Sequence, residues 1–211
     1  MNNIETRRER EKRLREAEIV DAAERVFYQK GFDAASMDEI AQTAQFTKRT
    51  VYQYFTHKEE LYFAVALKSF RILLSYFETA VAKGSTGIEK FQFSAQAYYQ
   101  FYQDQPAAFH ILNHCSYIQA DRETSPHFLA MANLKQEMVK LFAEAIETGK
   151  KDGTIRRDLD AAMGVYATMF LSIGFLTLLA QTGADLTRKI GVEQDEFVRF
   201  SFELIYRSLR A

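Results

Sequence analysis

The chain has 211 residues, of which 47% are hydrophobic and 26% are charged, and its formal net charge at pH 7 is −1. This composition provides an ample buried core and excludes an intrinsically disordered chain. Two prolines and nine glycines leave few breaks between elements, which excludes a fold of many strands and favours helix throughout.

The start of the chain and its cysteine content bear on location. The opening residues, MNNIETRRERE, lack the apolar segment of a secretory signal. The single cysteine, Cys115, has no partner for a disulfide within the chain. We therefore expect a cytoplasmic protein.

Positive charge is concentrated near the N-terminus, although the net charge of the whole chain is close to zero. Residues 7–15 contain six basic and two acidic side chains, and residues 40–58 contain three basic side chains and no acidic one. Clusters of lysine and arginine of this kind favour phosphate binding. A charged helix face that contacts only solvent remains the alternative explanation of the first cluster.

Two short helices are predicted after a longer first one. Apolar residues at helical spacing from Leu14 to Phe27 predict the first helix, with Gly31 as its C-terminal cap. Ser36 and Glu39 match a capping box, in which each side chain accepts a hydrogen bond from the other residue's backbone, and they predict the start of the second helix.

A tight turn near residues 43–46 separates the second helix from a third, which Thr47 caps and which continues to Phe55. Two short helices joined in this way form a helix-turn-helix, whose second helix enters the major groove of DNA. Arginine and lysine pair with guanine, glutamine with adenine, and threonine with several base edges, whereas Tyr52, Lys58 and the helix start behind Ser36 suit phosphates. A three-helix core with an unspecific polar flank remains the alternative.

Residues 19–61, IVDAAERVFYQKGFDAASMDEIAQTAQFTKRTVYQYFTHKEEL, closely resemble the DNA-binding domain of the tetracycline-repressor family. The resemblance runs in order through AAxxxF, a glycine-aromatic turn, MDEIA, TVYQYF and KEEL. It implies an all-helical homodimer that binds a double-stranded DNA operator and responds to a small-molecule effector. The base or groove readers that it implies are Thr47, Lys48, Arg49, Thr50 and Gln53, with Ser36, Tyr52, His57 and Lys58 towards the DNA backbone.

Three positions depart from the pattern of that family. Gln45 stands where the turn often has glycine, so the turn must tolerate a side chain at modest strain. Arg49 replaces a frequent small residue and places a longer side chain in the groove. His57 replaces a common serine or asparagine cap.

The rest of the chain predicts long helices over residues 58–82, 87–105, 106–117, 126–148, 159–181 and 194–210. Their breaks are marked by Gly84, by Pro106 and Pro126 in first helical turns, and by a polar segment at 149–158. We expect an all-α fold with a helix-turn-helix domain at residues 1–56, including a basic N-terminal extension. A larger helical domain for effector binding and dimerisation follows at residues 57–211.

Residues 161–184 carry no charge and are long enough to span a membrane. Small and polar residues are scattered through this segment, which favours a buried helix in a core or a dimer interface over a membrane span. The last helix also has an apolar or small stripe, and the family resemblance implies that the last two helices pair between subunits. The residues expected at that interface are Gly164, Leu171, Phe175, Phe197, Ser201, Leu204, Ile205 and Ser208.

Aromatic residues are dense in the middle helices, where most of them would be ordinary core. By resemblance, a subset lines a cavity for a hydrophobic or aromatic effector. The expected lining residues are Tyr98, Phe101, Tyr102, Phe109, Tyr117, Phe128, Met131, Tyr166 and Phe170. A metal site beginning at His110, His114 and Cys115, with His127 nearby, is the weaker alternative to ordinary packing, and we expect neither a metal nor a cofactor.

The sequence contains no phosphate-binding glycine loop, nucleophile elbow or paired carboxylates with a pocket signature, so an enzyme is not expected. The leading hypothesis is a ligand-responsive repressor. An activator, a ligand-independent regulator and a membrane-attached adaptor based on residues 161–184 are the alternatives.

Overall fold

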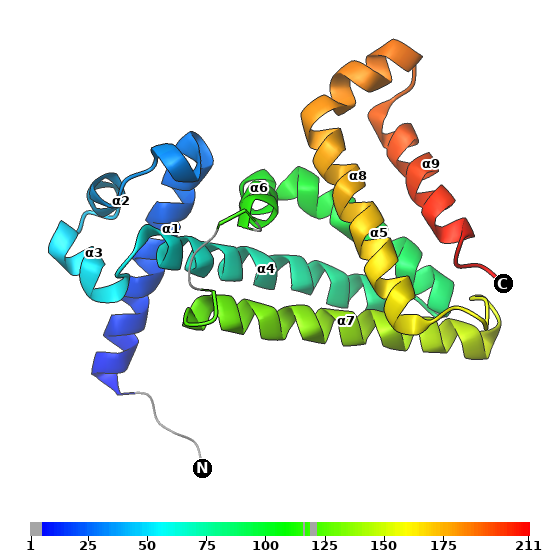
Figure 1. Ribbon diagram of the computed structural model, residues 1–211, viewed down its shortest axis with the longest axis horizontal. Helices are drawn as coiled ribbons and strands as arrows, with labels where there is room; N and C mark the ends of the chain where they lie inside the picture. The colour runs from blue at the N-terminus through cyan, green and yellow to red at the C-terminus, as the bar shows by residue number, and fades with distance from the viewer. Residues whose placement is uncertain (1–5, 116, 119–121) are drawn as a thin grey trace. The chain divides into compact units, whose positions relative to one another are not determined.

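The computed structural model describes residues 6–115, 117–118 and 122–211, and these form nine helices (Figure 1). The helices are α1 (Arg7–Ala34), α2 (Met37–Thr43), α3 (Lys48–Tyr54), α4 (Lys58–Lys83), α5 (Gly87–Asp104), α6 (Pro106–Cys115), α7 (Pro126–Asp152), α8 (Ala161–Ile190) and α9 (Gln194–Arg207). Among the described residues, β-structure is limited to an isolated bridge between Ile155 and Arg210. The prediction of an all-α fold is confirmed.

Helix α1 begins earlier than its apolar pattern indicated. Thr6 caps it, because the Thr6 hydroxyl accepts from the Glu9 backbone N–H at 3.3 Å and the Glu9 carboxylate accepts from the Thr6 N–H at 2.8 Å. Its backbone breaks at Gly31, where φ is 76°, and one further turn leads to Ala34. A positive φ of this size favours glycine, which explains why the break falls there.

Helix α8 is also longer than predicted, since it continues from residue 181 to Ile190. Glycine and threonine in this stretch are weak helix formers, which is why the sequence indicated an earlier end. In the structure the Thr187 hydroxyl bonds back to the Gly183 carbonyl at 2.9 Å, and Gly191 ends the helix with φ of 70°. The sequence predicted a helix over residues 106–117, whereas α6 ends at Cys115. Ser116 lies outside the described residues.

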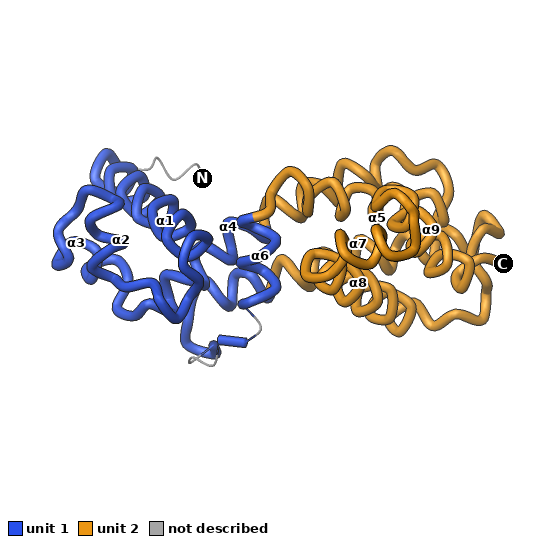
Figure 2. Tube along the Cα trace, turned by 90° about the horizontal axis from the view of Figure 1, so that it is seen from above, with its two compact units in different colours: residues 1–70, 107–132 blue, residues 71–106, 133–211 orange. Residues whose placement is uncertain are grey.

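The chain divides into two compact units (Figure 2). Unit 1 contains residues up to Phe70 together with residues 107–132, and unit 2 contains residues 71–106 and 133–211. Helices α4 and α7 contribute to both units, whereas α1, α2 and α3 belong to unit 1 and α5, α8 and α9 to unit 2. The functional boundary at residues 56 and 57 stays a prediction.

Each unit has its own aromatic core. In unit 1 the ring centroid of Tyr62 lies 4.9 Å from that of Phe27 and 5.3 Å from that of Phe32. The Tyr62 hydroxyl donates a hydrogen bond to the Ile111 carbonyl at 3.1 Å. Burial raises the pKa of Tyr62, so this hydroxyl stays protonated and remains a donor. Burying a large apolar side chain contributes about 1.5–3 kcal/mol, so α1, α4 and α6 are held together mainly by these rings.

In unit 2 the ring centroid of Phe142 lies 5.2 Å from that of Phe77 and 5.5 Å from that of Phe91. The start of α5 and the end of α7 approach each other closely. A Cβ atom added to Gly87 would lie 2.2 Å from the backbone nitrogen of Gly149. Only a residue without a side chain fits at this point. The Asp152 carboxylate fixes the same junction by accepting from the Gly87 N–H at 2.8 Å.

Candidate nucleic-acid interface

Only one of the two hydrogen bonds predicted for the capping box of α2 is present. The Ser36 hydroxyl accepts from the Glu39 N–H at 3.3 Å, which satisfies one of the free donors at the helix start. The reciprocal half of the expected capping box is wrong, because the Glu39 carboxylate forms an ion pair with Lys30 of α1. This ion pair fixes α2 against α1 in a way that the local pattern did not reveal.

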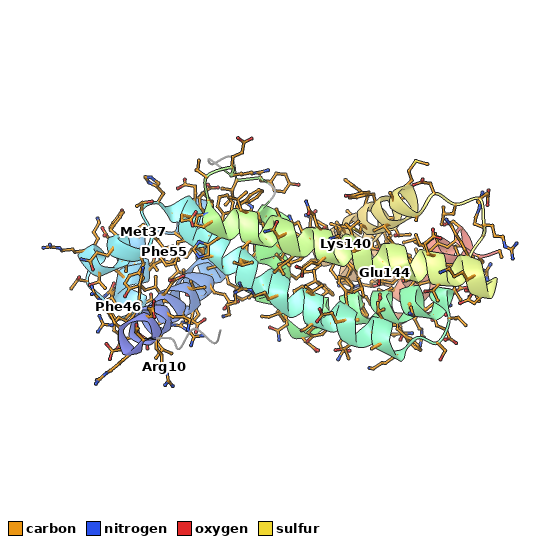
Figure 3. All side chains as sticks on the ribbon, turned by 90° about the horizontal axis from the view of Figure 1, so that it is seen from below. Arg10, Met37, Phe46, Phe55, Lys140 and Glu144 are labelled. Atoms are coloured by element: carbon orange, nitrogen blue, oxygen red, sulfur yellow. The ribbon has the colours of Figure 1, made fainter. Side chains whose placement is uncertain are left out.

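The turn between α2 and α3 contains the strain that the sequence predicted. Gln45 has φ of 57°. Among the residues that the structure describes, no other residue except glycine has a positive φ. The next N–H, that of Phe46, donates to the Ala41 carbonyl at 2.9 Å and closes the turn. Met37 and Phe55 are buried and Phe46 is half-buried, so apolar side chains flank the turn at this end of unit 1 (Figure 3).

Helix α3 has one buried and one exposed side. Val51 is fully buried and anchors it, and the Thr47 hydroxyl caps its start by accepting from the Thr50 N–H at 3.1 Å. Arg49, Tyr52 and Gln53 are exposed. Within the described residues no side chain binds Arg49 or Gln53, so α3 presents free hydrogen-bonding groups to solvent.

Five of the predicted DNA contacts line a single open groove of 440 Å³ beside α3. Its walls are formed by α2, α3 and the start of α4. The predicted contact residues along it are Ser36, Lys48, Tyr52, His57 and Lys58. The structure therefore brings together the four residues that were expected to face the DNA backbone and one expected groove reader, Lys48.

Both lysines that line this groove already have partners within the protein. Lys48 binds the Asp38 carboxylate of α2 at 2.7 and 2.9 Å, and this hydrogen bond raises the pKa of Lys48. Lys58 donates to the carbonyl oxygens of Phe32 and Ala35 at 2.6 and 2.9 Å, and its ammonium group lies 4.4 Å from the centre of the Phe32 ring. Lys58 therefore caps the end of α1, a contact between residues distant in sequence that periodicity cannot show.

A histidine that the sequence related only to metal binding instead joins three helices of unit 1. His127, at the start of α7, forms a hydrogen-bonded pair with Glu60 of α4, and its other ring nitrogen lies 3.5 Å from the Glu16 carboxylate of α1. The His127 ring centroid is 5.7 Å from that of Phe55, which ends α3. His127 thus contacts both Glu16 of α1 and Phe55, the residue that follows α3.

His110 and His114 line a 220 Å³ cavity of unit 1 together with Phe27, Phe32 and Tyr62. Cys115 is buried. Within the described residues, histidine, cysteine and acidic side chains form no group of three or more that could hold a metal ion.

The nine predicted effector-pocket residues are divided between the units. Tyr98, Phe101, Tyr102, Tyr166 and Phe170 belong to unit 2, and Phe109, Tyr117, Phe128 and Met131 to unit 1. Tyr98 and Phe101 are buried among the rings of unit 2, and burial raises the pKa of Tyr98. Tyr117, Tyr166 and Phe170 are exposed. The pocket stays a prediction.

An exposed apolar face covers one side of α8 and α9. Helix α8 is long and apolar enough to cross a membrane by length and composition, with a mean hydropathy of 1.8, but only 28% of its apolar window is buried within the chain. The predicted interface residues Leu171, Leu204 and Ser208 are exposed, Phe175, Phe197, Ser201 and Ile205 are half-buried, and Gly164 is buried against Ile146 and Leu159. The largest apolar side chains on this face that the sequence analysis did not assign to the interface are Met163, Tyr166, Phe170, Leu178 and Phe200.

Comparison with known sequences matches the same end of the chain. Residues 19–65 match the sequence model of a family described as bacterial regulatory proteins, tetR family. The HTH-type transcriptional activator FasR of Mycolicibacterium smegmatis is 28% identical over 123 residues, which cover 58% of this chain and 54% of that protein. The chain therefore spans about half the length of this relative.

Solved structures share the arrangement of helices over nearly the whole chain. A bacterial regulatory protein in the tetR family from Rhodococcus RHA1 superposes with a TM-score of 0.67 and 23% identity, covering 93% of this chain and 97% of that one. The regulator FadR from Bacillus subtilis, in complex with stearoyl-CoA, superposes with a TM-score of 0.68 and 15% identity, covering 92% and 99%. At these identities the likeness concerns the fold.

Proposed function

We propose that the chain, whose residues 19–65 match the sequence model of the tetR family of bacterial regulatory proteins, is a member of that family and regulates transcription by binding a double-stranded DNA operator through α3. The observation that carries this proposal is the exposed face of α3, on which Arg49 and Gln53 have no partner among the described residues. Arginine and glutamine can each form paired hydrogen bonds with a base edge in the major groove. The groove lined by Ser36, Tyr52 and His57 then follows the phosphate backbone.

The proposed binding form is a homodimer joined by α8 and α9. Phe200 and Leu204 lie four residues apart on the exposed side of α9, whereas Val198, Phe202 and Tyr206 occupy its buried side. One apolar stripe thus packs within unit 2 and the second stays open to a partner copy, together with the exposed side chains of α8. A twofold dimer of this kind matches a palindromic operator.

The proposed control is release from the operator by a small hydrophobic or aromatic effector bound by the larger helical domain. The aromatic core of unit 2 supplies the apolar surroundings that such a molecule requires. FadR from Bacillus subtilis was solved with stearoyl-CoA, a ligand with a long apolar chain. An effector acts only by binding the DNA-free conformation more tightly than the DNA-bound one.

Binding to the DNA upstream of the protein's own gene, measured over a range of salt concentrations against an unrelated duplex, tests the proposal. A preferential and steeply salt-dependent association is expected, because contacts with phosphates release counterions. Absence of binding to any duplex at low salt would overturn it. Such a regulator meets its operator in the cytoplasm and needs no catalytic group.

Activation is the second candidate for the direction of regulation, because FasR of Mycolicibacterium smegmatis is named a transcriptional activator. A reporter gene behind the identified operator distinguishes the two directions. Repression predicts higher expression when the protein is deleted, whereas activation predicts lower expression.

A further inference from the structure

We propose that the first turns of α1 form a second DNA-binding surface, in which Arg8, Lys12 and Arg15 bind phosphates that flank the bases read by α3. This inference rests on the proposed function, because both surfaces contact the same duplex. It adds a set of contacts that lies outside the helix-turn-helix and outside residues 19–65.

The first turns of α1 extend beyond the body of unit 1. Every residue from Thr6 to Arg15 is exposed, and the first buried residue of the helix is Ile19. At a rise of 1.5 Å per residue, about 15 Å of helix is therefore surrounded by solvent. A folding requirement for a core does not explain this segment, because it contributes nothing to the core.

Local interactions keep this projecting segment helical. The capping box between Thr6 and Glu9 satisfies donors at its start, and Arg7 pairs with Glu11 at 2.9 Å one turn later. The hydrogen bond from the Thr6 backbone lowers the pKa of Glu9, so its carboxylate stays charged in the cap. Both acidic residues of the segment are thus occupied by local contacts.

Three of the other cations of this segment share one face of the helix. Arg8, Lys12 and Arg15 are spaced four and three residues apart and so lie on one side of the helix. In the part of the chain that the structure describes, none of the three forms a hydrogen bond or an ion pair. Like charges at this spacing repel one another and destabilise a helix, and a row of phosphates would remove that repulsion.

The position of this face relative to α3 fits the same duplex. Glu16, the residue after Arg15, approaches His127, whose ring packs on Phe55 at the end of α3. Figures 1 and 2 show the start of α1 and helix α3 at the same end of unit 1, away from α6. The cationic face ends one residue before Glu16 and runs along α1 towards its start for about 12 Å, a length that spans several phosphates of a duplex.

The test compares two triple variants with equal loss of charge. One carries Arg8→Gln, Lys12→Gln and Arg15→Gln, and the control carries Lys135→Gln, Lys140→Gln and Lys151→Gln at exposed positions of α7 in unit 2. Affinity is measured by fluorescence anisotropy over a range of salt concentrations. The probes are an operator selected from random duplexes and trimmed to its core, and the same core with about ten further base pairs, one helical turn, on each side.

The expected result is a slope of log affinity against log salt that is smaller by about 2–3 for the α1 variant on the extended duplex, at about 0.9 per lost phosphate contact. The trimmed duplex should show a smaller difference, and the control should match the wild type. A single Arg10→Gln variant, on the other side of α1, should leave the slope unchanged. Circular dichroism should show equal helix content for all variants.

Equal slopes for the α1 variant and the wild type on the extended duplex would overturn this inference and leave the proposed function intact. Failure of the wild type to bind any duplex at low salt would overturn both. If the α1 variant kept its DNA slope but lost binding to vesicles containing phosphatidylserine, the face would be assigned to a membrane surface and the inference would be wrong.

Discussion

The ammonium nitrogen of Lys58 lies 2.6 Å from the carbonyl oxygen of Phe32, so the first residue of α4 caps the last turn of α1. Carbonyl groups at a helix C-terminus lack partners within the helix, and a cation there also interacts favourably with the helix dipole. The sequence analysis assigned Lys58 to a DNA phosphate. In the structure its hydrogen bonds are directed into the protein.

Replacing Lys58 by alanine is therefore expected to lower the free energy of unfolding by about 1.5–3 kcal/mol, the range for hydrogen bonds to charged groups. Urea unfolding followed by circular dichroism measures the change. Lys48→Ala is the matched control, since its ion pair with Asp38 is exposed to solvent and should contribute little to the free energy of unfolding. A Lys58→Ala protein of unchanged stability that bound every duplex more weakly would restore the phosphate role.

Arg49→Ala should reduce affinity for the operator by about 1–3 kcal/mol and relax discrimination at only a few base positions, because the role proposed for this side chain is base contact. Competition binding with single-base operator variants reveals the pattern. Lys135→Ala, on α7 of unit 2, should change neither affinity nor discrimination. Uniform weakening on all duplexes by Arg49→Ala would show a phosphate contact instead.

Leu204→Glu should convert the dimer into a monomer and remove tight operator binding, since it places a charge on the exposed apolar face of α9. Leu204 is 52% exposed within the chain, so the substitution should leave the fold of each subunit intact. Sedimentation velocity and operator affinity provide the two measurements. Leu129→Glu, at a leucine of α7 that is 47% exposed and lies in unit 1, should leave the protein dimeric. A monomeric Leu204→Glu protein with unchanged operator affinity would contradict the dimer proposal.

Gln45→Gly should raise the free energy of unfolding by about 1 kcal/mol, because the left-handed conformation at this turn strains any residue with a Cβ. Gln42→Gly in α2 provides the comparison, since glycine within a helix destabilises it by about 1 kcal/mol. Thermal unfolding should therefore shift in opposite directions for the two variants. A loss of stability in both would show that the Gln45 side chain contributes contacts that outweigh the strain.

Asp152→Asn should weaken unit 2 at neutral pH but not in acid. A hydrogen bond from the Thr154 hydroxyl at 2.6 Å and another from the Gly87 N–H at 2.8 Å lower the pKa of Asp152 below its ordinary value of 3.8. A lowered pKa contributes stability that is present above the ordinary pKa and is lost as the pH falls through the lowered one. Urea unfolding at several pH values should show the wild type and variant converging below about pH 4. A difference that is independent of pH would exclude the ionised carboxylate as the cause.

Much of the fold follows from local pattern. The order of helices was predictable because apolar residues recur at helical spacing and because prolines, glycines and capping residues mark the breaks. The cap by Thr47 and the strained turn at Gln45 were predictable for the same reason. The capping box of Thr6 and Glu9 carries the same signal as Ser36 and Glu39, and applying it there would have placed the start of α1 correctly.

Features that depend on contacts between distant residues were not predictable. The cap formed by Lys58 joins residues 26 positions apart, and His127 meets Glu60 from 67 positions away. Periodicity identifies an apolar stripe but cannot tell whether the chain itself or another copy covers it. Tyr166 and Phe170 were for this reason assigned to an effector pocket, although they lie on the exposed face of α8, where Phe170 is 77% exposed.

Because Cys115 is buried, the reaction of its thiol with a reagent reports local opening of unit 1. This thiol is the only one in the sequence, and it lies at the end of α6 with 4% of its surface exposed. A thiol reagent can reach it only when this part of unit 1 opens, so the labelling rate measures the opening equilibrium without any engineered probe. Adding operator DNA or a candidate effector would then show directly, through slower or faster labelling, whether either molecule stabilises unit 1.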